Sequence, residues 1–186
     1  MRILTDIDEV CLQLSDALQA FLATKGHHTP ERMRDHHNIP DLFDITIPET
    51  LAYVRDFHRS PAFGTLLPEP CAAAVLPDLH RRGHTFVAVT ACLNEPDVVA
   101  RRTRNLEETF GFRWEAIHCI GLSLNKAPVL QTYAPSVWVE DMWHHAVTGA
   151  ALGHRTFLID RKYNRDHTQA DITRVHDWHE IARRLA

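Results

Sequence analysis

Acidic, hydroxyl and amino side chains stand beside short apolar segments at four places in the chain. Two acids follow the first segment, a threonine ends the second, a lysine begins a short helix, and two more acids follow the last segment. In chain order these residues are Asp6, Asp8, Thr90, Lys126, Glu140 and Asp141. We expect them to form one site, because each separate segment supplies a side chain that can bind an ion.

Carboxylates that share a site impose a definite electrostatic requirement. Two of them about 4 Å apart repel by ~4 kcal/mol at an effective dielectric of roughly 20, so one is protonated or a cation lies among them. Mg²⁺ prefers hard oxygen ligands, which carboxylates and a phosphate oxygen provide. Lys126 adds positive charge and Thr90 adds a hydroxyl donor. The set therefore predicts Mg²⁺ and an anionic ligand, with phosphate as the first candidate.

The apolar pattern indicates how the chain positions these residues, since apolar runs predict strands and helical spacing predicts helices. The expected strands are 2–6, 84–90, 116–120, 137–139 and 156–159, and the expected helices are 9–24, 69–83, 94–110, 126–133, 145–152 and 176–186. This alternation predicts an α/β fold with a Rossmann-like, doubly wound parallel sheet. Ligands bind beyond the carboxyl ends of such strands, where the polar residues fall.

Residues 24–68 interrupt the alternation, because they hold five prolines and only short apolar clusters. The segment predicts short helices near 31–37, 41–44 and 48–58, without a strong strand. A strand–helix–strand link needs roughly 30 residues, and the chain between Asp8 and Thr90 holds about 50 more. We therefore expect residues 1–23 and 69–186 to form the core and residues 24–68 to be a helical insertion.

Composition excludes several classes of protein. The formal net charge is −4, from 20 Lys+Arg against 24 Asp+Glu, so we expect no nucleic-acid polymer as a partner. No apolar run approaches the ~20 residues that span a bilayer, and the acidic start is unlike a signal peptide, which predicts a cytoplasmic protein without a membrane partner. The four cysteines form no C-x-x-C pair, so neither structural zinc nor a disulfide framework is expected. The sequence is compatible with a homodimer.

Four motifs resemble those of the haloacid dehalogenase-like superfamily of phosphatases. The first is an apolar strand followed by D-x-D, here ILTDIDEV, and the second is an apolar strand that ends in Thr, here FVAVT. The third is a lone lysine at a helix start, here LNKAPVL, and the fourth is an apolar strand followed by paired acids, here VWVEDMWHHAVTGAALG. The resemblance covers the expected core and implies a phosphomonoester hydrolase that acts on a small phosphorylated substrate.

The resemblance implies a role in phosphoryl transfer for each motif residue. Asp6 is the nucleophile and forms an aspartyl-phosphate. Asp8 is the general acid for the leaving group and then the base that activates water. Thr90, Ala91 and Lys126 bind the phosphoryl group. Splitting hydrolysis into two displacements in this way is nucleophilic catalysis.

The resemblance also implies Mg²⁺ as the cofactor. Asp6, Asp141 and the backbone carbonyl of Asp8 are the implied ligands, so the metal residues are Asp6, Asp8 and Asp141. Glu140 supports these ligands or binds the ion indirectly. Mg²⁺ stabilises the charge on the transferred phosphoryl group in enzymes of this kind.

The insertion makes the chain similar to the 5′(3′)-deoxyribonucleotidase branch of the superfamily. That similarity implies that residues 24–68 form a small helical cap of the first type, and it makes nucleoside monophosphates candidate substrates. The candidate substrate contacts in and near this cap are Phe43, Tyr53, Arg55, Phe57, His58 and Phe63. The chain departs from the branch at Glu9, where Gly is usual, so the acid either changes the floor of the site or adds a fourth negative charge there.

Two other hypotheses stay open at this point. One is a non-catalytic phosphate-binding or regulatory member of the same fold, which turnover with Mg²⁺ would exclude. The other is a transition-metal sensor or store built on the 14 histidines, which include the doublets His27-His28, His36-His37 and His144-His145. Adjacent residues in a helix or strand point in different directions, so a doublet alone does not make a chelating pair.

Overall fold

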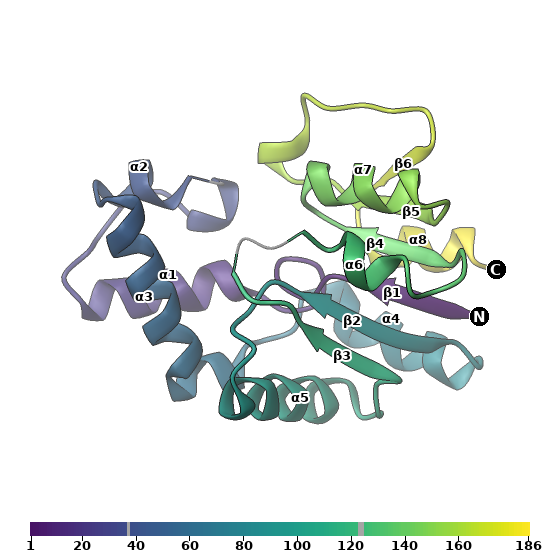
Figure 1. Ribbon diagram of the computed structural model, residues 1–186, viewed down its shortest axis with the longest axis horizontal. Helices are drawn as coiled ribbons and strands as arrows, with labels where there is room; N and C mark the ends of the chain where they lie inside the picture. The colour runs from purple at the N-terminus through teal and green to yellow at the C-terminus, as the bar shows by residue number, and fades with distance from the viewer. Residues whose placement is uncertain (37, 123–124) are drawn as a thin grey trace.

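The computed structural model describes residues 1–36, 38–122 and 125–186. Its strands form one six-stranded parallel sheet in the order β3-β2-β1-β4-β5-β6 (Figure 1). The strands are β1 (Arg2–Thr5), β2 (Thr85–Thr90), β3 (Ala116–Cys119), β4 (Val137–Glu140), β5 (Arg155–Ile159) and β6 (Ile172–Val175). The chain starts at the centre, builds outward through β2 and β3, and then crosses to β4. This arrangement confirms the expected doubly wound α/β fold and places its switch point between β1 and β4.

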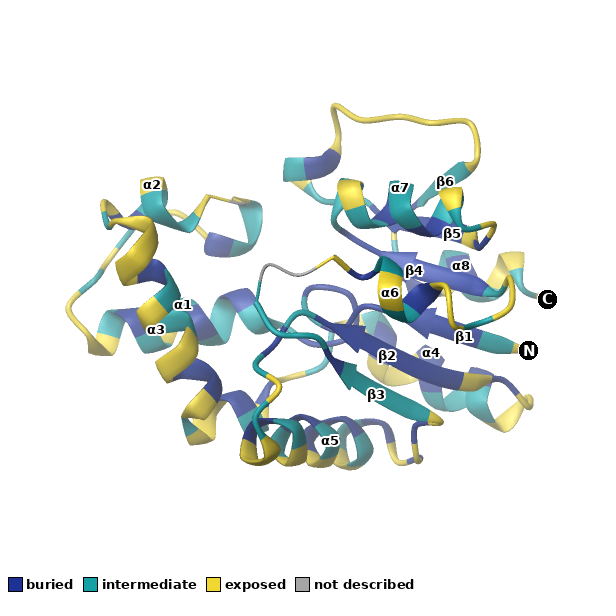
Figure 2. Ribbon diagram, in the orientation of Figure 1, coloured by how far each residue is buried: buried dark blue, intermediate teal, exposed yellow. Residues whose placement is uncertain are grey.

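The central strands are buried on both faces, as a parallel sheet covered by helices requires (Figure 2). In β1, Leu4 lies in register with Val87 of β2 and with Trp138 of β4. These three side chains share one apolar cluster with Leu130, whereas Ile3 belongs to the larger cluster on the opposite face. Because successive side chains of a strand point to opposite faces of the sheet, this alternation determines which strand residues face each layer of helices.

Helices cover both faces of the sheet. On the side of the larger cluster, the sheet is covered by α4 (Pro70–Arg81), α5 (Pro96–Phe110) and α8 (Trp178–Arg184), and α4 packs against both others. The opposite face is covered by α6 (Ala127–Leu130) and by α7 (Trp143–Ala151), which packs on β4 and β5. No helix within the described ranges is both long and apolar enough to cross a bilayer.

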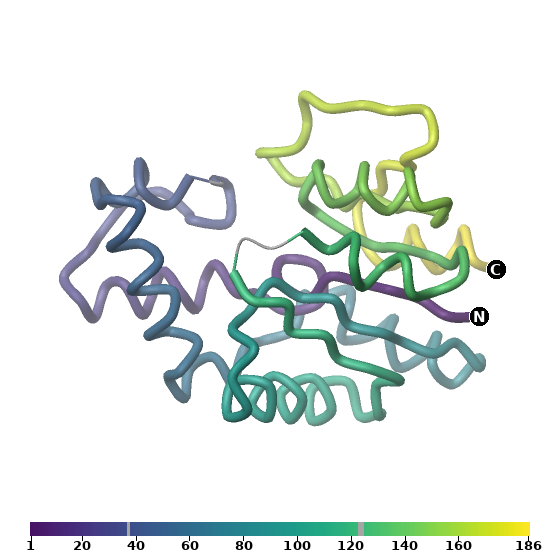
Figure 3. The backbone as a smooth tube through the Cα atoms, in the orientation of Figure 1, coloured from purple at the N-terminus to yellow at the C-terminus, as the bar shows by residue number. Residues whose placement is uncertain are grey.

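A second group of helices stands beyond the ends toward which the strand arrows point, opposite the two chain termini (Figures 1 and 3). Its members are α1 (Leu14–Thr24), η1 (Met33–Asp35), α2 (Ile39–Phe43), α3 (Ile47–Arg59) and η2 (Pro61–Thr65), where η denotes a 3₁₀ helix. Helix α1 packs against η1, α3 and η2. The expected helix at 31–37 is wrong, because this segment forms only the single turn η1; His37 lies outside the described residues.

Two further expectations about secondary structure were wrong. The helix expected from residue 9 begins at Leu14, because the chain first makes a tight turn in which Cys11 and Leu12 both donate backbone hydrogen bonds to the Ile7 carbonyl. Strand β6 was not expected. It lies at the sheet edge, pairs only with β5, and buries only its last residue, so its sequence lacks an apolar run.

Candidate active site

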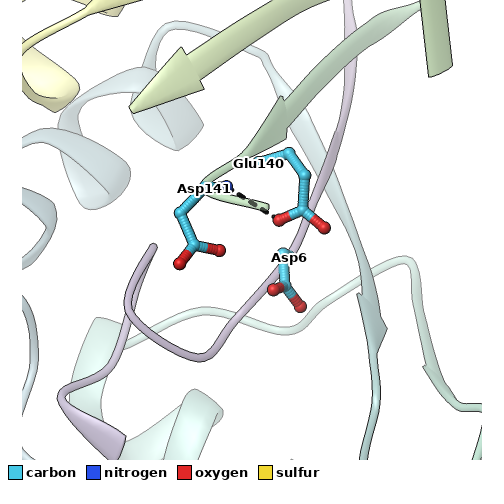
Figure 4. Close-up of side chains that lie close together, drawn as sticks. All are labelled: Asp6, Glu140 and Asp141. Carbon is cyan, nitrogen blue, oxygen red and sulfur yellow. Dashed lines mark hydrogen bonds between the residues drawn. The ribbon is translucent and has the colours of Figure 1, made fainter. Parts of the chain in front are cut away.

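The carboxyl ends of the two central strands, β1 and β4, bring three acids together. Asp6 follows β1, Glu140 ends β4 and Asp141 comes next. All three are buried, and one carboxylate oxygen from each lies within 4.8 Å of the other two (Figure 4). The Asp141 amide also donates a hydrogen bond of 2.8 Å to Glu140, which fixes the Glu140 carboxylate beside the strand end.

Lys126 lies against this acidic group. Its ammonium is 2.8 Å from a carboxylate oxygen of Asp6 and 2.8 Å from one of Glu140, and its side chain is 1% exposed. Burial alone lowers the pKa of Lys126, but the negative charges of Asp6 and Glu140 outweigh burial and raise it. The side chain is therefore a buried cation in contact with the Asp6 carboxylate.

The other two acids carry raised pKa values. Burial, followed by the charge of Asp6, raises the pKa of Glu140 and raises that of Asp141 to about 6. Crowded carboxylates of this kind take up either a proton or a metal ion. One buried oxygen of Asp141, Oδ1, has no hydrogen-bond donor within the described part of the chain.

The donor set at this edge is compatible with Mg²⁺. The Asp141 oxygen without a donor and the neighbouring Asp6 carboxylate are hard anionic oxygens, the ligand type that Mg²⁺ selects. The Tyr163 hydroxyl donates to the other oxygen of Asp141, Oδ2, and the Asn164 amide donates to the Asp141 carbonyl at 2.7 Å. These contacts hold Asp141 in place while leaving Oδ1 available.

Asp8 does not join the close acidic group, because its carboxylate turns toward β2. The Thr90 hydroxyl donates to Asp8 Oδ2 at 3.2 Å, and the guanidinium of Arg102 donates to Oδ1 at 2.6 Å. Burial raises the pKa of Asp8, and the charge of Arg102 opposes this effect. The structure thus groups Asp8 with Thr90 and adds a buried arginine.

A cavity of about 220 Å³ lies above these residues. Asp6, Asp8, Lys126 and Asp141 line its charged end, together with Ala91. Thr90 is fully buried and is not among the lining residues, so its hydroxyl reaches the site through Asp8 in this arrangement.

The wall of the cavity opposite the acids comes from the helical group. Leu14, Met33 and Ile39 contribute apolar surface, and His36 lies among them. Ion pairs anchor this wall to the core: Arg34 pairs with Glu69 at 2.6 Å and lies 3.6 Å from Glu9, and Asp35 pairs with Lys162 at 2.7 Å.

None of the six candidate substrate contacts is among the residues that line this cavity. Phe43, Phe57 and Phe63 are buried in the apolar cluster instead. The Tyr53 hydroxyl forms a hydrogen bond of 2.9 Å with the ring of His27. The wall residues Met33 and Ile39 stand in a segment with no regular apolar pattern, which gave no basis for expecting them.

Sequence reasoning also missed Arg102 and Tyr163. Arg102 had a detectable pattern, because it stands four residues after Val98 and four before Leu106, on the buried stripe of α5. An arginine on an apolar stripe requires a partner in the interior. Tyr163 lies in the short 3₁₀ helix η3 (Lys162–Asn164) after β5 and gave no comparable indication.

The histidine doublets do not form a metal site in the described residues. The one group of metal-capable side chains found there is Asp6, Glu140 and Asp141, without a histidine. His36 pairs with Glu31 at 2.7 Å, and the rings of His144 and His145 lie 3.9 Å apart. His145 lines the cavity, and burial followed by the charge of Lys126 lowers its pKa to about 3.

Comparison with known proteins gives a relative in sequence and neighbours in structure. No protein-family model matches the chain. An uncharacterized 32.4 kDa protein in the Gp30-rIII intergenic region of Enterobacteria phage T4 is 23% identical over 192 residues, which cover 98% of this chain and 69% of that protein.

Solved structures match almost the whole chain. A predicted phosphatase from Clostridium acetobutylicum has a TM-score of 0.67 at 12% identity and covers 99% of this chain and 97% of its own. A dehalogenase has a TM-score of 0.63 at 12% identity, and the match covers 100% of this chain and 96% of the dehalogenase. D,D-heptose 1,7-bisphosphate phosphatase from Burkholderia thailandensis has a TM-score of 0.58 at 11% identity, and the match covers 99% of this chain and 97% of the phosphatase. The chain has the fold of haloacid dehalogenase-like phosphatases and dehalogenases.

Proposed function

We propose that this protein is a Mg²⁺-dependent phosphomonoester hydrolase that works through an aspartyl-phosphate on Asp6. The observation that carries the proposal is the contact of Lys126 with Asp6 inside a group of buried carboxylates at the switch point of the sheet. A buried cation beside a carboxylate, at the charged end of a cavity, supports attack on a phosphate group. The fold shared with known phosphatases is consistent with this chemistry.

The proposed reaction has two displacements. An Asp6 oxygen bonds to phosphorus while the bond from phosphorus to the ester oxygen breaks, and Asp8 gives its proton to that oxygen, which leaves as an alcohol. A water oxygen then bonds to phosphorus, the bond to Asp6 breaks, and one water proton passes to Asp8. Lys126 and the backbone at Ala91 hold the phosphoryl oxygens, because both line the charged end of the cavity.

Asp6, Asp141 and the backbone carbonyl of Asp8 would hold Mg²⁺, with Glu140 orienting the amide of Asp141 beside them. When bound, the ion supplies positive charge that stabilises the phosphoryl oxygens. Lys126 holds the Asp6 carboxylate in a fixed orientation within the cavity, so that it can act as a nucleophile.

We also propose that the helical insertion acts as a cap over this site. The wall formed by Met33 and Ile39 supports this role, since both stand between α1 and α3 and line the cavity. Residues 24–68, together with α1, would then contribute the substrate contacts, and residues 1–13 and 69–186 the chemistry. The packing of α1 on η1 and α3 supports including α1 in the cap.

Nucleoside monophosphates and smaller phosphomonoesters are both candidate substrates. The cavity of about 220 Å³ is below the roughly 300–1,000 Å³ of sites that enclose a drug-sized ligand. The apolar wall supports a compact organic group. A nucleotide would need the cap to move outward.

The decisive experiment is phosphate release from aryl phosphates, small alkyl phosphates and nucleoside monophosphates, with Mg²⁺ and with chelator. We expect turnover that chelator abolishes and that Asp6→Asn reduces by more than about a thousandfold. The exposed Asp166→Asn is the matched control and should retain activity. A phosphoryl group on the Asp6 peptide after acid quenching would support the intermediate. If the folded protein with Mg²⁺ releases no phosphate from any of these substrates, the hydrolase proposal fails and the phosphate-binding alternative gains support.

A further inference from the structure

Arg102 is a fully buried arginine that points from helix α5 toward the proposed general acid. Its side chain is 0% exposed, and its guanidinium donates to Asp8 Oδ1 at 2.6 Å. The centre of the guanidinium lies 4.1 Å from the centre of the Phe63 ring, which covers one side of the planar group. The arginine is thus held between an apolar ring and a carboxylate.

Burying the charge of Arg102 costs free energy that its contacts in the described structure do not fully offset. Two nitrogens of Arg102, Nε and Nη1, are buried and have no hydrogen-bond partner in the described ranges. Its charge also interacts with the thiols of Cys92 and Cys119 and with the ring of His58. Replacing a buried ion pair by apolar side chains of similar volume is often neutral or stabilising, so fold stability alone does not require an arginine here.

The two oxygens of Asp8 have different surroundings. Oδ1 faces the buried guanidinium of Arg102, whereas Oδ2 accepts a hydrogen bond from Thr90 at 3.2 Å. The guanidinium can occupy only one oxygen, because Nη2 alone approaches the carboxylate. Asp8 also lines the cavity, and Oδ2 is the oxygen that Arg102 does not bind.

We infer that Arg102 is a positioning residue that holds Asp8 by Oδ1, so that Oδ2 is the atom that exchanges the proton. The inference rests on the proposed function. In the first displacement the proton on Oδ2 passes to the ester oxygen as its bond to phosphorus breaks, and in the second Oδ2 takes a proton from the attacking water. Throughout, Oδ1 keeps its hydrogen bond from Arg102, which fixes the rotation of the carboxyl group.

This role predicts a dependence on the leaving group. A poor leaving group needs a proton as it departs, whereas a nitrophenolate departs without one. Loss of the arginine should therefore slow poor leaving groups selectively. A purely structural role for Arg102 would slow all leaving groups to the same extent.

The test compares Arg102→Met with wild type on para-substituted phenyl phosphates of similar size, from nitrophenyl to methylphenyl, in saturating Mg²⁺. A positioned acid contributes roughly 10²- to 10⁴-fold, and we expect Arg102→Met to lower kcat/KM, which reports the step that releases the leaving group, at least about tenfold more for the methylphenyl ester than for the nitrophenyl ester. Arg102→Lys should restore part of the loss, because an ammonium can donate to Oδ1 but cannot reproduce the planar contact with Phe63. The exposed Arg104→Met, on the same helix, should leave the series unchanged.

A double variant completes the design. In an Asp8→Asn background, Arg102→Met should produce no further selectivity among leaving groups. Equal losses across the series, or continued selectivity without the Asp8 carboxyl, would overturn the inference while leaving the hydrolase proposal intact. Complete inactivity of the wild type on every ester would instead remove the proposed function, and this inference with it. If Arg102→Met does not fold, Arg102→Lys carries the same comparison.

Discussion

The Glu9 carboxylate accepts a hydrogen bond of 2.7 Å from the backbone amide of Ser15, in the first turn of helix α1. The amide is one of the donors that a helix leaves without an internal partner, and a carboxylate there also interacts favourably with the helix dipole. The second Glu9 oxygen lies 3.6 Å from Arg34. Glu9 lines the cavity, but its charge is directed to the helix end and to an arginine.

The backbone at Glu9 predicts an unusual order of stability among its variants. Glu9 has φ = 58°, in the left-handed region where any residue with a Cβ is strained by about 1 kcal/mol. Glu9→Ala loses the hydrogen bond and keeps the strain, so we expect it to lower the free energy of unfolding by about 1 to 2 kcal/mol. Glu9→Gly also loses the hydrogen bond but relieves the strain, so it should be more stable than Glu9→Ala.

Urea denaturation of both variants checks this order. Asp44 provides a comparison, because it is exposed and also has a positive φ, 51°. Asp44→Gly should likewise be more stable than Asp44→Ala. A Glu9→Ala protein as stable as Glu9→Gly would show that backbone strain at this turn is unimportant.

The sequence determined much of this site because parallel strands share one direction. Once Asp6 and Glu140 were assigned to strand ends, a parallel sheet required both to lie at the same edge. Lys126 was assigned to that edge because it stands between the end of one strand and the start of the next. The order β3-β2-β1-β4-β5-β6 then places the strands of Asp6 and Glu140 side by side. The chemical roles of these residues stay predictions until activity is measured.

The parts of the site that the sequence did not predict depend on packing between segments that are far apart in the chain. Met33 lines the cavity because ion pairs of neighbouring residues anchor its turn to the core, and no local pattern encodes such a contact. Tyr163 binds Asp141 from the 3₁₀ helix η3, which is tied to the edge strand β6 by a hydrogen bond from Arg174 to the Asn164 carbonyl. The turn before α1 was missed because its apolar residues continue the helical spacing although Glu9 breaks the helix geometry.

Removing the buried ammonium should destabilise the protein strongly. Lys126→Met leaves the Asp6 and Glu140 carboxylates buried without their cation. Loss of one partner from a buried ion pair costs about 3 to 5 kcal/mol, so we expect a loss of this size in urea denaturation at pH 7 without metal. Lys162→Met removes a largely exposed partner of Asp35 and should cost less than about 1 kcal/mol. Equal losses of unfolding free energy in the two variants would contradict the interpretation of Lys126 as a buried cation.

Mg²⁺ should stabilise the folded protein through Asp141. A ligand that binds only the folded state adds about 2.7 kcal/mol when its free concentration is 100 times its dissociation constant. We therefore expect the thermal midpoint to rise with Mg²⁺ and to return with chelator. Asp141→Asn should remove most of this rise, because it replaces the buried oxygen that lacks a donor with an amide. Asp171→Asn is an exposed control. A Mg²⁺-induced rise that is the same in Asp141→Asn would place the ion elsewhere.

Gly149 should tolerate no side chain, although it lies inside a helix. A Cβ at this position would lie 2.2 Å from Cδ1 of the buried Trp138. Overpacking costs typically 1–3 kcal/mol, while helix propensity returns at most about 1 kcal/mol, so Gly149→Ala should reduce the free energy of unfolding. Gly64→Ala is the control, because its nearest neighbour would be Arg101 at an ordinary 3.5 Å. An unchanged urea midpoint for Gly149→Ala would mean that α7 can move away from the sheet at little cost.

His58 should make the protein sensitive to acid. It is buried, and its Nδ1 accepts a hydrogen bond from the Leu93 amide, so the neutral ring is the form that the fold holds. Burial, followed by the charge of Arg102, lowers its pKa to about 3. Between pH 6.5 and 3 the unfolded chain therefore binds a proton that the folded chain does not, and stability falls as the pH falls. From pH 6.5 to 4 the loss from this group is on the order of 3 kcal/mol.

His58→Asn tests this dependence because its side-chain oxygen can still accept from the Leu93 amide and carries no titrating proton. The variant loses packing at every pH, so the comparison concerns the slope of unfolding free energy against pH. We expect a shallower slope between pH 6.5 and 4 than in the wild type, whereas the exposed His28→Asn should keep the wild-type slope. Parallel curves for wild type and His58→Asn would show that the acid sensitivity comes from other groups, because the variant lacks the ring nitrogen that takes up the proton.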